Sequence, residues 1–92
     1  MAFAFVTDSG TAFEVRDGRI TRIAGHCVQD AVTRVDIPGE IVAEPFTWIT
    51  PPEVGSRASL VLKNRSHVFG GAKALTTSPV VLVAPVVDVE RV

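Results

Sequence analysis

Valine and threonine outnumber leucine so strongly that they constrain the fold of this chain more than any other feature. The chain has sixteen valines and eight threonines but only four leucines. β-branched side chains lose rotamer freedom in a helix and pack well on a pleated surface. Turn signals recur about every 8–14 residues, a spacing typical of a sandwich or barrel. We therefore predict an all-β fold: a small antiparallel β-sandwich or partly open β-barrel of about six to eight short strands, with little or no helix.

The dipeptide Asp17-Gly18 predicts a β-hairpin between Thr11–Arg16 and Arg19–Ala24. A two-residue type I′ turn needs positive φ at both positions, which Asp-Gly tolerates. The predicted cross-strand partners are Val15 with Ile20, Phe13 with Arg22, Glu14 with Thr21, Ala12 with Ile23, and Arg16 with Arg19.

Alternation of apolar and polar residues between the other turn signals predicts further strands. In Arg57–Asn64 the side chains of Ala58, Leu60 and Leu62 share one face. The segment Val80–Ala84 is apolar at every position, which predicts burial on both faces. Pro45 predicts an edge or a bulge within its strand, because proline cannot donate to the ladder. The remaining predicted strands are Ala2–Thr7, Ala31–Ile37, Glu40–Thr50 and Ala72–Thr77, and alternation resumes after Pro85.

The length of 92 residues predicts one domain, residues 1–92, whose core alone gives marginal stability. Cys27 is the only cysteine, so a disulfide within the chain is excluded. With Cys27, His26 and His67 as the available ligands, a four-ligand zinc site is not expected. We predict no metal and no cofactor. Oligomerisation is the stabiliser that remains, and the 47% apolar content favours it.

The charge is nearly balanced, which argues against several classes of partner. A net charge of −1 without a basic stripe disfavours nucleic acid. No secretion signal is evident, and the longest apolar run, Val80–Val87, is far shorter than the roughly 20 residues of a membrane span. We predict a location in a virion or the cytoplasm, no membrane contact and no small-molecule substrate.

The pair His26-Cys27 is the one place where nucleophilic catalysis is conceivable. A thiolate needs a base close in space, which His26 or His67 could supply, with Asp30 as the orienting acid. Neighbouring residues of a strand point to opposite faces, and small buried cysteines are common. We therefore predict that Cys27 is an ordinary apolar side chain and that the protein is not an enzyme.

The segment Phe46-Thr47-Trp48-Ile49 has apolar groups on both faces. The favoured interpretation puts the aromatic side chains in the core. The alternative is an interface anchor, since tryptophan is enriched in binding hot spots. The predicted interface residues are Phe46, Trp48, Ile49, Val87 and Val89.

The stretch Phe13–Gly25, followed by Val35-Asp36 and Pro38-Gly39, resembles the small β-domain that opens amidohydrolases. That family continues with a paired-histidine metal motif. The corresponding stretch here, Ala43–Ile49, has no paired histidines, so the resemblance implies neither an activity nor a metal site for this chain.

These observations favour a non-enzymatic structural protein: a self-associating subunit, either of a homo-oligomer or of a multi-protein particle. The most concrete version is a bacteriophage virion component, namely a capsid decoration, head–tail joining or tail protein. The terminal strands Ala2–Thr7 and Val86–Val92 are expected to pair with neighbouring subunits. The alternative is a monomeric SH3-like interaction module that binds a peptide or a partner strand near Phe46 and Trp48.

Overall fold

The computed structural model describes residues 2–25, 29–35, 37, 40–66 and 70–86. Within these ranges the chain forms seven strands and no helix, which confirms the all-β prediction. The strands are β1 (Ala2–Thr7), β2 (Ala12–Arg16), β3 (Arg19–Ala24), β4 (Gln29–Asp30), β5 (Glu44–Thr50), β6 (Arg57–Ser66) and β7 (Ala72–Pro85).

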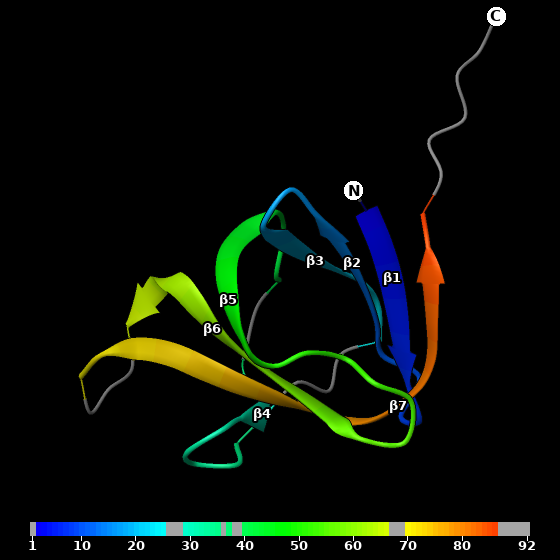
Figure 1. Cartoon of the computed structure of the whole chain (residues 1–92). Coiled ribbons are helices and arrows are strands. Elements are labelled where there is room, and N and C mark those ends of the chain that lie inside the picture. Colours follow the sequence, from blue (N-terminus) through cyan, green and yellow to red (C-terminus); the bar gives the residue numbers. More distant parts are fainter. Residues whose placement is uncertain (1, 26–28, 36, 38–39, 67–69, 87–92) are drawn as a thin grey trace, which may run out of the picture.

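Six of the strands close into an antiparallel barrel (Figure 1). Their order is β1-β2-β3-β5-β6-β7, and β1 also pairs with β7 from Phe3↔Pro85 to Thr7↔Val80. The short strand β4 lies outside this ring and pairs with β7 alone. The weakest part of the wall is between β3 and β5, where only Arg19↔Pro45 and Ile20↔Glu44 form ladder pairs. The barrel is thus closed rather than partly open.

The barrel interior is filled by apolar side chains from every wall. The predicted one-sided strand is confirmed, because Ala58, Leu60 and Leu62 of β6 are all fully buried. The rings of Phe5 and Phe13 stack with their centroids 5.0 Å apart. The core also contains Val15, Ile20, Ile37, Ile41, Phe46, Leu75 and Val80. Side chains fill the interior of a barrel with so few strands.

The β2–β3 hairpin has the predicted turn and most of the predicted register. Asp17 and Gly18 have φ of 52° and 74°, as a type I′ turn requires. Val15↔Ile20, Phe13↔Arg22, Glu14↔Thr21 and Arg16↔Arg19 pair as expected. A bulge between Ala12 and Phe13 shifts the next pair, so Ala12 faces Ala24 and not Ile23. A bulge adds one residue to one strand, which the hairpin turn does not determine.

The predicted strand Ala31–Ile37 is wrong, because the chain turns there. Asp30 Oδ1 accepts hydrogen bonds from the backbone N–H of Val32 at 2.8 Å and of Thr33 at 3.1 Å. This side-chain bond competes with extended pairing and closes an Asx-type turn. The predicted Pro38-Gly39 turn lies outside the described residues.

The strand predicted from residue 40 starts only at Glu44, with Pro45 near its beginning. The guanidinium of Arg65 on β6 contacts the first residue of β5, Glu44, and the loop before it at Glu40. Its Nε and Nη2 donate to the two oxygens of the Glu44 carboxylate at 2.8 and 2.7 Å, and Nη2 also donates to Glu40 O. Such forked pairing is geometrically specific and fixes this loop against the end of β6.

The two strands predicted over residues 72–84 form one long strand, β7. Its pairing with β6 shifts register between Arg57 and Ser59, and there the Thr77 side chain replaces a ladder contact. The Thr77 hydroxyl accepts the Ala58 N–H at 3.1 Å and donates to Ser78 O at 2.7 Å. The first half of β7 pairs with β6 and the second half with β1, so a single strand closes the barrel.

Candidate functional site

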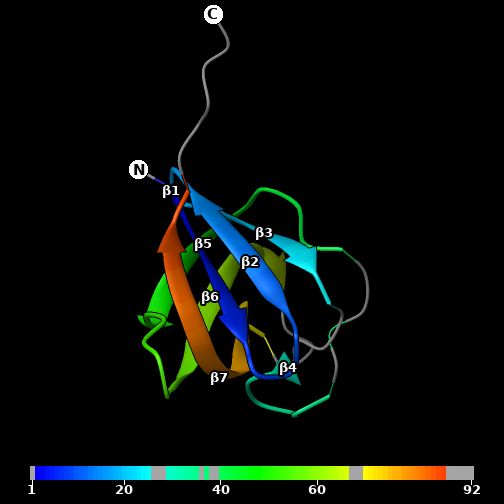
Figure 2. The same ribbon diagram turned by 90° about the vertical axis from the view of Figure 1, so that its right-hand side faces the viewer.

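The most unusual surface of the barrel is the outer side of β1 and β7, which Figure 2 shows from the front. Val81, Leu82 and Val83 are all exposed, Leu82 by 53%. Their predicted burial on both faces is therefore wrong. Only Val80 of this run is buried, and it reaches the core beside Thr7.

A bulge explains why the consecutive side chains of Val81 and Leu82 are both exposed. Thr7 pairs with Val80, and the next residue of β1, Val6, pairs with Leu82. Val81 is thus the extra residue, which interrupts the alternation of sides along β7. Direct cross-strand partners share a face, so Leu82 lies beside Val6, and Ala84 beside Ala4. We call this surface the β1–β7 wall: Ala4, Val6, Val81, Leu82 and Ala84. Val83 pairs with the buried Phe5 and so lies on the inner side of the sheet, although it is partly exposed.

The β1–β7 wall is apolar, and its side chains from β1 are small. Ala4 and Val6 are half-buried by neighbours within the sheet. Both edges of β1 are hydrogen-bonded, to β2 and to β7. The expectation that Ala2–Thr7 adds to a neighbouring sheet is therefore wrong. Both edges of β1 are already paired within the chain, and only its outer face is available to a partner.

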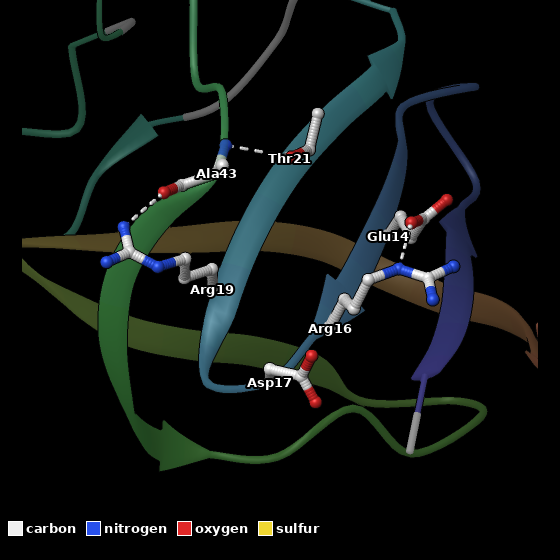
Figure 3. Close-up of a pocket in the computed structure, with 6 residues that line it drawn as sticks. All are labelled: Glu14, Arg16, Asp17, Arg19, Thr21 and Ala43. Carbon is white, nitrogen blue, oxygen red and sulfur yellow. Dashed lines mark hydrogen bonds and ion pairs between the residues drawn. The ribbon is translucent and has the colours of Figure 1, made fainter.

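A charged hollow of about 280 Å³ lies next to the wall, on the outer side of β2 and β3 (Figure 3). Arg16 Nε donates to Glu14 Oε1 at 3.2 Å, and Arg19 Nη1 donates to Ala43 O at 2.9 Å. The Ala43 N–H donates to Thr21 Oγ1 at 2.9 Å. These contacts join the loop before β5 to the hairpin. With Asp17 also lining it, the hollow contains two basic and two acidic side chains, which gives it no preference for ions of one sign.

The aromatic pair of β5 lies mainly inside. Phe46 is buried, and Trp48 is half-buried with its ring centroid 4.7 Å from that of Phe46, in an edge contact. Trp48 also stacks on Phe3, at 6.3 Å. Ile49 is exposed beside a register shift between Trp48 and Thr50. Val87 and Val89 lie outside the described residues, so contact of these five residues with another chain stays a prediction.

The residues considered for catalysis and zinc binding, His26, Cys27 and His67, also lie outside the described residues. Within the described part of the chain, His, Cys, Asp and Glu side chains form no group suited to a metal ion. Asp30, considered as an orienting acid, is buried, and its carboxylate holds the turn that follows it. In the same ranges there is no helix with the length and apolar character to cross a bilayer.

No protein-family description matches this chain, and neither a curated protein nor a solved structure is significantly similar to it. Sequence inspection missed the β1–β7 wall, since it read the apolar run as core. The one available signal was Pro79, which marks the irregularity just before the bulge.

Proposed function

We propose that this protein is a non-enzymatic structural subunit that self-associates through the outer surface of its barrel within a larger assembly. The observation that carries the proposal is the β1–β7 wall. Val81 and Leu82 are exposed on the outer side although the barrel is closed and its interior contains a packed apolar core. No intramolecular surface remains for them within the described residues, and contiguous exposed apolar side chains mark interaction sites.

The chemistry of the wall favours another protein surface over a small ligand. The wall is the outer face of a sheet, whereas small-molecule sites are concave. Two sheets pack face to face at about 10 Å when their side chains are small enough to interdigitate. The charged hollow beside the wall supplies a polar rim of both signs, which is the usual surround of an apolar contact.

The most concrete version is a bacteriophage virion component: a capsid decoration, head–tail joining or tail protein. It is supported by analogy of size and architecture, since a small closed barrel with an apolar outer face suits a repeated building block. The test is size-exclusion chromatography with light scattering from micromolar to high micromolar concentration, together with copurification with capsid or tail components. A monomer at every concentration that binds no such component would refute the proposal.

The runner-up is a monomeric SH3-like interaction module that binds a peptide or partner strand near Trp48. One observation favours it: Trp48 keeps part of its surface exposed, next to the exposed Ile49. Trp48→Ala separates the two functions. A folded variant that has lost a peptide partner would support the module, whereas a variant that unfolds would assign Trp48 to the core.

A further inference from the structure

The turn after β4 displays two valine side chains to solvent. Val32 is 67% exposed and Val35 64% exposed. In Figure 1 this turn projects from the side of the barrel, away from the β1–β7 wall. We call residues 31–35 the valine turn. The side chains of Val32 and Val35 are too exposed to contribute to the core of their own molecule.

Several hydrogen bonds and one ion pair hold the valine turn. The Asp30 carboxylate accepts the N–H groups of Val32 and Thr33, and Asp30 N donates to Val35 O at 2.9 Å. Lys73 Nζ lies 3.9 Å from Asp30 Oδ2, and Ala31 N donates to Ala74 O on β7. A preorganised turn loses little conformational entropy when it binds, so its two valines are suited to insertion.

The backbone of Arg34 independently shows that the turn keeps its shape despite an unfavourable conformation. Its φ is +62°, and its N–H donates to Asp30 O at 2.9 Å. A non-glycine residue in this region costs of order 1 kcal/mol, and such strain concentrates at functional positions.

A matching hollow lies at the end of β3, lined by Arg22, Ile23, Ala24, Gly25, Glu40 and Val42. Its volume of about 260 Å³ is below the roughly 300–1,000 Å³ of small-molecule sites and suits one or two inserted side chains. Ile23 and Val42 are exposed apolar residues on its rim. We call this surface the β3-end hollow.

Each of the two surfaces has one charged side chain without a partner, and these two charges are opposite. Arg34 is on the valine turn, and Glu40 lines the β3-end hollow together with Arg22, which has an interaction partner of its own. Among the described residues, neither the Arg34 guanidinium nor the Glu40 carboxylate has a hydrogen-bond or ion-pair partner. Four of the exposed large apolar residues thus belong to these two surfaces, with one unpaired cation on the first and one unpaired anion on the second.

We propose that the valine turn of one copy inserts Val32 and Val35 into the β3-end hollow of a second copy, with Arg34 paired to Glu40. This inference rests on the proposed self-association and specifies a second contact for it. Because the two surfaces differ, the contact is either head-to-tail or reciprocal about a two-fold axis. Together with the β1–β7 wall it gives each subunit two interfaces, enough to extend an assembly beyond a dimer.

The test is a charge exchange, followed by sedimentation velocity over a range of concentrations. Arg34→Glu and Glu40→Arg each weaken self-association about five- to tenfold, and the double variant restores it. Lys63→Glu is the matched control, since it reverses an exposed charge on β6 and leaves association unchanged. Val32→Ser combined with Val35→Ser weakens association about tenfold or more. Circular dichroism and Trp48 fluorescence establish that each variant is folded.

The possible outcomes separate this contact from the proposed function. If the wild type associates and Leu82→Asp weakens it, while the valine-turn variants associate normally, the wall stands and the valine-turn contact is overturned. Failure of the double variant to recover association overturns the pairing of Arg34 with Glu40. A wild type that is monomeric throughout overturns both proposals.

Discussion

Two leucines of this chain provide opposite readouts of the proposed function. Leu62 is fully buried in the core, whereas Leu82 is 53% exposed on the β1–β7 wall. Truncation of a buried leucine to alanine costs about 2–5 kcal/mol, through lost transfer free energy and the cavity left behind. In a domain of this size each kcal/mol lowers the melting temperature by about 4–8 °C. We therefore expect Leu62→Ala to lower the Tm by at least about 8 °C.

Leu82→Ala should leave the Tm almost unchanged and weaken association instead. Full burial of a leucine contributes about 1.5–3 kcal/mol, so the exposed half of Leu82 retains about 0.8–1.6 kcal/mol for a partner. If both copies bury it in one interface, the loss doubles to about 1.6–3.2 kcal/mol. At 1.4 kcal/mol per tenfold, the dissociation constant rises roughly 15- to 200-fold.

The assay pairs thermal unfolding, followed by circular dichroism, with sedimentation equilibrium of the same samples. The reasoning predicts a clean separation, in which Leu62→Ala changes the Tm and Leu82→Ala changes the dissociation constant. A Leu82→Ala variant that associates as tightly as the wild type would refute the wall as an interface. An equal loss of Tm in both variants would refute the assignment of Leu82 to the surface.

Three further predictions concern the stability of the barrel. Gly25→Ala should lower the free energy of unfolding strongly in urea, because a Cβ there would lie 2.7 Å from the backbone Thr11 Cα. Gly55→Ala is the control: its φ is also positive but its surroundings are open, so it should show only the cost of placing alanine at a positive φ. Arg65→Lys should cost about 1–3 kcal/mol, since lysine keeps the charge but loses the forked contact with Glu44; equal urea midpoints for variant and wild type would contradict this. Thr77→Val should cost about 1–3 kcal/mol, because the buried Ala58 N–H loses its acceptor, and faster hydrogen exchange at that amide is the specific readout; unchanged exchange would count against it.

Local signals in the sequence were sufficient for the hairpin and for most strands near it. The bounds of β1 and β3 match the predicted strands, and Asp17-Gly18 determined the turn type. These features depend on short-range sterics and on the alternation of apolar and polar residues, and both can be inferred from a single sequence. The buried face of β6 followed from the same alternation.

The failures have two causes: a local side-chain hydrogen bond in one case and pairing between residues distant in sequence in the other. Asp30 converts a segment with good strand alternation into a turn, because its carboxylate satisfies two backbone N–H groups. Val81 and Leu82 are both exposed because a bulge opposite β1 interrupts the alternation of sides along β7. The apolar composition of that run was visible, but its side of the sheet depends on the pairing of residues about 75 positions apart.

The closure of the barrel has a consequence for the order of events in folding. The seam between β1 and β7 joins residue 3 to residue 85, so it unites the most distant strands of the ring in the sequence. Such contacts have the largest loop-closure entropy and are typical of slow steps in folding. The β1–β7 wall is built across this seam, so it exists only once the ring is complete. If the wall is the interface of the proposed self-association, a chain whose seam is still open lacks the surface that a second copy would contact.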